Sequence, residues 1–350
     1  MSQDKKPITA YKELLDIPEQ KQNLPGLEGK MDPLAQHTQM EAWDDQGNPY
    51  LVEYKGSGKL KGKAAIITGG DRLLHHSLGK VKVLTNIAPL GSPSGIGRAV
   101  AYFFVREGAD VTITYLKQEK EEQVPHSIPP SAIRSRSFMY YAPATPPNSA
   151  EKVKDKIEKE EGGKCHIVEC DLIKHEDCER VVKEHMQKYG KMSILVNNAS
   201  KQIMCEDIAD IDLKNVESTF QSNIVAMIAM AKYAVPHMKR GSTIVNSTSV
   251  TAFKGSPAMV DYSSTKGAIA TFTRSLGLQL ASKGIRVNAV APGPVLTPLQ
   301  PASRPKEQMD DWEVNKLPLW GRAGMPAELA ASYVSASERK PGSGKPVLWG

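Results

Sequence analysis

The chain has 350 residues, of which 40% are hydrophobic and 24% are charged, and its net charge is +6. This composition is ordinary for a globular protein that can bury a large core. The small basic excess suits ligands that carry phosphate, but no basic stripe interleaved with aromatic residues indicates a nucleic-acid partner. No apolar run approaches the roughly 20 residues of a membrane-spanning helix, and no signal-peptide segment opens the chain. We therefore expect a cytoplasmic protein with neither nucleic acid nor membrane as a partner.

The first part of the chain differs in character from the rest. Residues 1–58 are polar and lack sustained periodicity, which predicts an extended N-terminal arm of low local stability. In residues 59–334, short apolar runs alternate with helical patterns, which predicts an α/β domain. The expected architecture is a single Rossmann-like, doubly wound parallel sheet with helices on both faces. Strands are expected near residues 64–68, 110–114, 165–169, 194–196, 242–246 and 285–290, and helices near 95–107, 150–161, 176–189, 213–238, 260–283 and 326–334.

The four cysteines of the chain lie in or near one predicted strand–helix unit. Cys165, Cys170, Cys178 and Cys205 match neither a disulfide framework nor the spacing of a standard zinc site. A strand followed by an amphipathic helix would scatter these side chains over different faces. We therefore expect small buried thiols and no metal site.

Small and polar residues follow three of the predicted strands. Gly69 ends the first apolar run, Asn197-Asn198-Ala199 ends the fourth, and Pro292-Gly293 ends the sixth. In a doubly wound sheet, ligands bind at the carboxyl ends of the strands. These positions are therefore candidates for a binding site.

A candidate catalytic group lies between the last two of these motifs. Tyr262 and Lys266 stand four positions apart in a helical pattern, so both side chains lie on one face. An isolated tyrosine has a pKa of about 10, and a neighbouring cation favours its phenolate. Ser249, thirteen positions before Tyr262, adds a hydroxyl that can polarise a carbonyl. A Tyr-x-x-x-Lys pair alone recurs by chance, so the neighbouring motifs decide its meaning.

Taken together, these motifs resemble the classical short-chain dehydrogenase/reductase family. Within it, the likeness is to the glucose and ribitol dehydrogenase homologues, through residues 24–28, 30–33 and 56–63. The resemblance runs from about residue 24 to residue 334. It implies an NAD(P)-dependent oxidoreductase that acts on a sugar, polyol or other small carbonyl/alcohol substrate. The family is usually homo-oligomeric.

The resemblance also implies a role for each member of the catalytic group. Ser249 would hold the substrate oxygen and Tyr262 would supply the proton. Lys266 would lower the pKa of the tyrosine and bind the nicotinamide ribose. Asn223, in the segment Thr-Phe-Gln-Ser-Asn-Ile, would relay protons through a helix-bound water. The family spacing to the tyrosine selects Ser249 over Ser247.

By the same resemblance, a larger set of residues would contact the cofactor: Gly69, Asp71, Ser94, Ile96, Gly97, Arg98, Lys117, Asp171, Leu172, Asn197, Ala199, Tyr262, Lys266, Pro292, Gly293, Val295 and Thr297. Asn197 would lie beside the adenosine and Asp171 at the adenine, although these two suit a strand-end turn and a helix cap equally well. The second strand ends without an acid before Glu119, and Arg98 and Lys117 could face a 2′-phosphate. The sequence therefore favours NADP, with NAD as the alternative.

The glycine loop of this fold is interrupted. The family pattern T-G-x-x-x-G-x-G is divided between residues 68–71 and 94–98, with residues 72–93 inserted between its halves. The insertion is either a retained intron or gene-model error, or a genuine loop that still lets the halves meet. Phosphate binding by such a turn needs a few consecutive backbone N–H groups. An intact phosphate site is therefore in question.

Three further segments concern the surroundings of the site. A second insertion lies near residues 124–148, and the Pro-rich residues 294–317 suit a mobile substrate lid. Residues 335–350 form an atypical tail, and the last strand of the family's sheet is apparently missing from it. Loss of that strand would expose the edge of its neighbour and puts the usual oligomer interface in doubt. The alternative function is therefore a catalytically impaired or non-catalytic family member. A Rossmann-like methyltransferase is disfavoured by the joint presence of Ser249, Tyr262 and Lys266.

Overall fold

The computed structural model describes residues 7–22, 28–69, 95–116, 149–310, 312, 321–338 and 348–349. Several sequence expectations lie outside the described residues. They are the two insertions, near residues 72–93 and 124–148, and the candidate cofactor residues Asp71, Ser94 and Lys117.

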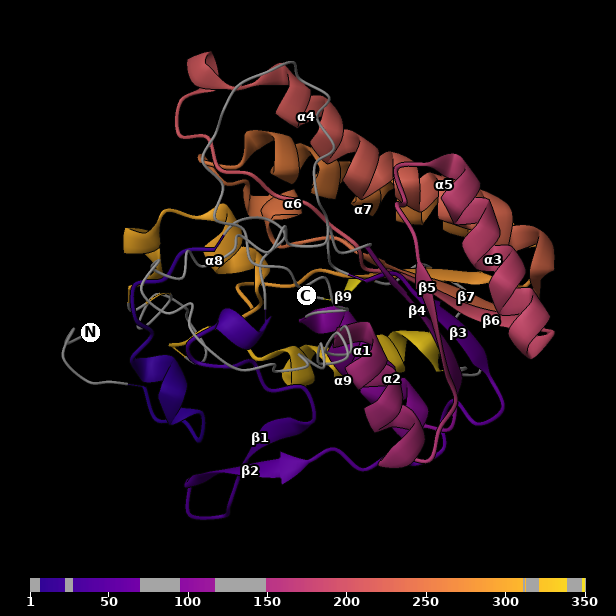
Figure 1. Cartoon of the computed structure of the whole chain (residues 1–350), viewed down its shortest axis with the longest axis horizontal. Coiled ribbons are helices and arrows are strands. Elements are labelled where there is room, and N and C mark those ends of the chain that lie inside the picture. Colours follow the sequence, from indigo (N-terminus) through magenta and orange to yellow (C-terminus); the bar gives the residue numbers. More distant parts are fainter. Residues whose placement is uncertain are drawn as a thin grey trace, which may run out of the picture.

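A parallel sheet occupies the centre of the described structure, with strand order β5-β4-β3-β6-β7-β8-β9 (Figure 1). Its strands are β3 (Ala64–Ile67), β4 (Asp110–Tyr115), β5 (Cys165–Glu169), β6 (Met192–Asn197), β7 (Met238–Ser247), β8 (Arg286–Val290) and β9 (Leu348–Trp349). The chain runs outward from β3 through β4 to β5 and then returns to β6 on the other side of β3. The strand order thus reverses between β3 and β6, where doubly wound sheets bind ligands.

Helices cover both faces of the sheet, because parallel strands are apolar on both sides. One buried cluster joins the sheet to α1 (Ile96–Arg106), α2 (Ser149–Lys159) and α9 (Pro326–Ser337). A second cluster joins the other face to α3 (His175–Tyr189), α5 (Ala226–Ala234) and α7 (Val260–Leu280). Figure 1 shows these two layers on opposite sides of the strands. The doubly wound α/β fold predicted from the sequence is confirmed.

The helix predicted over residues 213–238 is interrupted. It consists of α4 (Leu213–Phe220), a π-helical turn η5 (Gln221–Val225), α5 and a short 3-10 turn η6 (Val235–His237). Pro236 lies in that last turn and lacks an N–H group, which ends the helical hydrogen bonding. Strand β7 then begins at Met238, so the helical segment ends within one residue of the predicted end.

The expectation that the last strand is missing also needs correction. β9 comprises only two residues, and it pairs in parallel with β8, Leu348 opposite Ala289 and Trp349 opposite Val290. The edge of β8 presents backbone N–H and C=O groups that even a very short segment can satisfy. The atypical tail therefore supplies a two-residue strand beside β8.

The N-terminal arm is more ordered than its composition predicts. It contains two 3-10 turns, η1 (Lys12–Leu15) and η2 (Glu28–Lys30), and an antiparallel hairpin of β1 (Gln39–Trp43) and β2 (Pro49–Glu53). Its apolar side chains pack against the segment after β8 in a separate cluster of Tyr11, Leu14, Ile17, Met31, Leu296, Met309, Trp312, Ala323 and Met325. We call this cluster the arm–lid core, because it attaches the arm to the predicted substrate lid.

Within the described part of the chain, no helix is both long and apolar enough to cross a lipid bilayer. The cysteines Cys165, Cys170 and Cys178 are buried, and Cys205 is partly exposed. The described residues contain no group of His, Cys, Asp or Glu side chains placed to hold a metal ion.

Candidate active site

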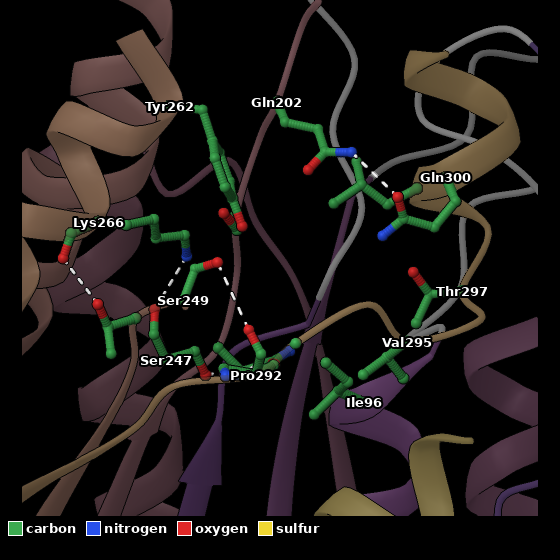
Figure 2. Close-up of a pocket in the computed structure, with 15 residues that line it drawn as sticks. Ile96, Gln202, Ser247, Ser249, Tyr262, Lys266, Pro292, Val295, Thr297 and Gln300 are labelled. Carbon is green, nitrogen blue, oxygen red and sulfur yellow. Dashed lines mark hydrogen bonds between the residues drawn. The ribbon is translucent and has the colours of Figure 1, made fainter. Parts of the chain in front are cut away.

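A cavity opens at the carboxyl edge of the sheet, where the sequence placed its candidate residues (Figure 2). It is built from the ends of β6, β7 and β8, the start of α1, the first turns of α7 and the lid. The lining residues are Ile96, Asn198, Ser200, Gln202, Ser247, Thr248, Ser249, Tyr262, Lys266, Pro292, Gly293, Val295, Thr297, Leu299 and Gln300.

Ser249 and Tyr262 meet in this cavity. Tyr262 lies in the first turn of α7, which begins at Val260, and Ser249 follows the end of β7. Burial raises the pKa of the Tyr262 phenol to about 12, and a hydrogen bond with the Ser249 hydroxyl opposes that rise. Ser249 Oγ also accepts the Thr251 N–H at 3.2 Å, which fixes its position. The phenol is therefore protonated at neutral pH and directed at a second hydroxyl.

Lys266 lies one helical turn beyond Tyr262, on the same face of α7. Its side chain is 2% exposed, and burial lowers its pKa to about 7. Nζ donates to the Ser247 carbonyl at 2.9 Å and lies 5.3 Å from the centre of the Tyr262 ring. The sequence predicted that this amine lowers the pKa of the tyrosine. In the structure, burial raises the pKa of the tyrosine, and the groups that oppose the rise are Ser249 and Arg304, whereas the Lys266 amine points to the β7 backbone and is itself desolvated.

The two candidate serines after β7 have different surroundings. Ser247 Oγ shares a 2.6 Å hydrogen bond with the Tyr333 hydroxyl of α9 and so faces that helix. The Ser249 hydroxyl lies 3.5 Å from the Pro292 carbonyl, to which it donates, and it lines the same cavity as Tyr262. The choice of Ser249 over Ser247 stays a prediction from the spacing.

Asn223 lies in the π-helical turn and holds the loop that follows β6. Its Oδ1 accepts the Lys201 N–H at 2.7 Å, and its Nδ2 donates to the Lys201 carbonyl at 2.7 Å and to Thr265 Oγ1 at 3.1 Å. Its amide is thus engaged in protein contacts. A proton relay at this residue would have to use another of its groups.

A second, smaller cavity lies on the other side of the β3 end and shares Ser200 with the first. It is lined by Gly69, Thr114, Tyr115, Leu116, Cys170, Leu172, Ala199 and Ser200. Three of the predicted cofactor residues, Gly69, Leu172 and Ala199, lie here. Seven others, Ile96, Tyr262, Lys266, Pro292, Gly293, Val295 and Thr297, line the first cavity.

Four of the described predicted residues, Gly97, Arg98, Asp171 and Asn197, line neither cavity. Asn197 is 2% exposed, and its Nδ2 donates to Asn246 Oδ1 at 3.0 Å within the sheet. The Asp171 carboxylate accepts the Ile173 N–H at 3.1 Å, in the turn that leads to α3. Asn197 thus lies at a strand end, as the structural alternative had it. Asp171 stabilises a turn but does not cap α3, whose N-cap residue is Lys174.

The start of α1 approaches the lid closely. Gly95 has a φ of 61°, and an added Cβ would lie 2.7 Å from Thr297 Cγ2. At Gly97, an added Cβ would lie 2.9 Å from Asn198 Nδ2. A side chain at either position would have to displace Thr297 or Asn198, and the positive φ of Gly95 also disfavours other residues there.

Glu28 of the arm reaches the same helix end, and sequence reasoning assigned it no role. Its Oε2 accepts the Gly95 N–H at 3.3 Å and lies 3.8 Å from Arg98 Nη1, while Oε1 bonds to His37. Burial alone would raise the pKa of Glu28, but His37, Arg98 and the Gly95 amide lower it to about 2. Arg98, a predicted ligand of the 2′-phosphate, is thus paired with a carboxylate from the arm.

A doubly wound sheet with a Ser–Tyr–Lys group at its carboxyl edge defines a dehydrogenase of the short-chain type, and comparison with known proteins agrees. The family model for short chain dehydrogenases matches residues 140–308. The uncharacterized oxidoreductase YhdF of Bacillus subtilis is 39% identical over 91% of this chain and 87% of its own length. The glucose and ribitol dehydrogenase of Daucus carota is 37% identical over 91% of this chain and 89% of its own.

Other similarities lead to the same class. The NADPH-dependent aldehyde reductase 1 of Arabidopsis thaliana, a chloroplastic protein, is 39% identical over 81% of this chain and 82% of its own. In fold, the chain resembles a short chain dehydrogenase of Burkholderia cenocepacia solved with NADP, with a TM-score of 0.62 and 24% identity over 83% of this chain and 97% of the other. The chain belongs to the short-chain dehydrogenase/reductase family of oxidoreductases and is similar to the glucose and ribitol dehydrogenases within it.

Proposed function

We propose that the protein is an oxidoreductase that uses NADP, or alternatively NAD, to interconvert a small sugar, polyol or other carbonyl compound with its alcohol. The observation that carries the proposal is the convergence of Ser249, Tyr262 and Lys266 on one cavity, with Lys266 one helical turn beyond the tyrosine and its Nζ 5.3 Å from the centre of the tyrosine ring. Names of relatives support the substrate class, since one is a glucose and ribitol dehydrogenase and another an NADPH-dependent aldehyde reductase.

The two cavities have chemistry that fits the two ends of a nicotinamide dinucleotide. The smaller one offers an apolar slot between Leu116, Leu172 and Ala199, which suits an adenine ring. The larger one offers the Lys266 amine and the Thr297 hydroxyl, which suit a ribose and a carboxamide. Nicotinamide, when bound, supplies or accepts the hydride. Arg98 and Lys117 are our proposed contacts to a 2′-phosphate, and the pairing of Arg98 with Glu28 places that cation in competition with a carboxylate.

Each member of the catalytic group has a distinct task in the proposal. Ser249 donates a hydrogen bond to the substrate oxygen, which polarises the carbonyl. Tyr262 gives its hydroxyl proton to that oxygen, so that carbonyl, hydride and proton together form the alcohol. Lys266, when protonated, stabilises the phenolate that remains. Return of a proton to the phenolate through water near Asn223 stays part of the proposal.

The pKa of Tyr262, raised to about 12, favours the reducing direction. At neutral pH the phenol retains its proton and can donate it, whereas alcohol oxidation first needs a phenolate. The pKa of Lys266, lowered to about 7, keeps a fraction of this amine neutral at neutral pH and so does not force the tyrosine to ionise.

The test is a Tyr262→Phe variant, compared with a Tyr50→Phe control on the exposed hairpin. Fluorescence titration with NADPH and NADH measures cofactor binding, and NADPH oxidation with small aldehydes measures turnover. Removing one proton donor should lower turnover by about 100- to 10,000-fold and leave cofactor affinity unchanged. Tyr50→Phe should match the parent. Turnover of Tyr262→Phe within threefold of the parent would reject the mechanism, and a parent that binds neither nucleotide would support the non-catalytic alternative.

A further inference from the structure

Two glutamine side chains line the active-site cavity without any part in the Ser–Tyr–Lys chemistry. Gln202 is 3% exposed and lies in the loop after β6, whereas Gln300 belongs to α8 (Leu299–Ser303) of the lid. Figure 2 shows the pair across the cavity from Ser249 and Tyr262, with the Gln202 oxygen on the tyrosine side and its nitrogen toward Gln300.

Arg304 determines which way the Gln300 amide faces. Its Nε donates to Gln300 Oε1 at 3.0 Å, and because a guanidinium has only donors, the atom that it meets must be the oxygen. The same oxygen lies 3.4 Å from Gln202 Nε2. The Gln300 nitrogen therefore points away from Arg304 and toward the cavity, as it does in Figure 2.

Ser303 independently determines the orientation of Gln202. The Ser303 hydroxyl donates to the Leu299 carbonyl at 2.7 Å, so it must accept from its other neighbour, Gln202 Nε2, at 2.6 Å. The Gln202 nitrogen is thus directed to the lid, and Oε1 is left on the cavity side. Within the described part of the chain, neither Gln202 Oε1 nor Gln300 Nε2 has a protein hydrogen-bond partner.

Both amides are positioned by contacts that extend beyond the cavity. Asn223 bonds both backbone groups of Lys201, the residue immediately before Gln202. Arg304 lies 5.5 Å from the centre of the Trp312 ring, which belongs to the arm–lid core. The cavity therefore presents one oriented acceptor and one oriented donor, and buried polar groups of this kind favour ligands that satisfy them.

We propose that Gln202 and Gln300 bind a hydroxyl group of the substrate, and that they select hydroxylated carbonyl compounds and polyols over apolar aldehydes and ketones. A hydroxyl both donates and accepts, so it can satisfy Gln202 Oε1 and Gln300 Nε2 together. An apolar chain would leave both amide groups desolvated and unpaired, which is why sites built for a hydroxyl strongly reject analogues that lack it. The inference rests on the proposed function and names its substrate class.

The experiment compares glyceraldehyde with propanal, which has the same three carbons and no hydroxyl groups. Steady-state NADPH oxidation is measured for the parent, Gln202→Met and Gln300→Met, because methionine keeps the length of the side chain. We expect each variant to lose about 10- to 100-fold in kcat/KM for glyceraldehyde, mainly through KM, and to keep or improve its activity on propanal. Gln308→Met, the same change on the outer part of the lid, should alter neither. Equal losses on both aldehydes, or no loss on either, would overturn the proposal.

Failure of the proposed function would look different, because the parent would then turn over neither aldehyde. In that case, ligand-observed NMR of ribitol with the parent and with each methionine variant still decides the matter. Weaker ribitol binding by the variants than by Gln308→Met supports the amide site, and equal binding rejects it. If Gln202→Met loses its native circular dichroism spectrum, the half-buried Gln300→Met carries the comparison.

Discussion

Arg322 is the most deeply buried cation that joins the N-terminal arm to the rest of the molecule, among the residues that the structure describes. Its side chain is 1% exposed, with Nη2 3.1 Å from Glu41 of β1 and 2.9 Å from Glu328 of α9. The guanidinium also lies 4.8 Å from the centre of the Tyr11 ring. Glu41 is equally buried, at 1% exposed.

An Arg322→Met substitution should therefore destabilise the protein severely. It removes the charge but keeps an apolar stem, and it leaves the Glu41 carboxylate buried without its partner. Breaking a buried pair in this way costs about 3–5 kcal/mol. Urea denaturation followed by circular dichroism measures the loss as a lower midpoint at an unchanged slope. Glu41→Gln in the same background should recover part of the loss, because it removes the uncompensated charge.

The matched control is Lys306→Met, which breaks an ion pair between the lid and Glu19 of the arm. Lys306 Nζ lies 3.0 Å from Glu19, but the two side chains are 58% and 47% exposed. Exposed pairs contribute about 0–1 kcal/mol, so this variant should remain within that range of the parent. A loss below about 1 kcal/mol for Arg322→Met, or equal losses for both variants, would refute the reasoning from burial.

The remaining predictions concern the cofactor and the active-site lysine. Deleting residues 72–93 rejoins the glycine motif and should tighten NADPH binding strongly in a fluorescence titration, and an unchanged affinity would contradict this. The parent should have a higher kcat/KM with NADP than with NAD. Arg98→Ala or Lys117→Ala should reduce the ratio of these two values, because each removes a cation from the 2′-phosphate. An unchanged ratio in both variants would show that the phosphate site is misplaced. Lys266 has a pKa near 7 when folded and 10.5 when unfolded, so the unfolded chain binds more protons between these values and the parent gains stability as pH rises through them. Lys266→Met should thus be more stable than the parent at pH 7 and should lack that gain. Urea denaturation of both proteins at pH 7 and pH 9 tests this, and an equal change in the free energy of unfolding between the two pH values would disprove it.

The features predicted correctly from the sequence are those that depend on local spacing. The run from Ala64 to Ile67 is apolar throughout because that strand is buried on both faces, so its pattern is visible in the sequence. Tyr262 and Lys266 share a helix face for reasons of helix geometry alone. Such signals need no knowledge of the remainder of the fold.

Other features depend on contacts between distant parts of the chain. Gln202 and Gln300 are 98 positions apart, and only the position of the lid brings their amides together. Asn197 belongs to a recognisable motif, but whether its side chain turns to the cavity or into the sheet is decided by Asn246 on the neighbouring strand. β9 has two residues, which is too short for any periodicity.

The arm–lid core also determines the order in which the molecule can be completed during synthesis. Thr9 and Arg322, which are hydrogen-bonded at 2.8 Å, are 313 positions apart in the chain. The arm is synthesised well before its packing partners, so the central strands can pair while the arm still has nothing to bind. The wall of the cavity that carries Gln300 is therefore assembled last. A tag or truncation at the N-terminus should consequently impair substrate binding before it disturbs the sheet.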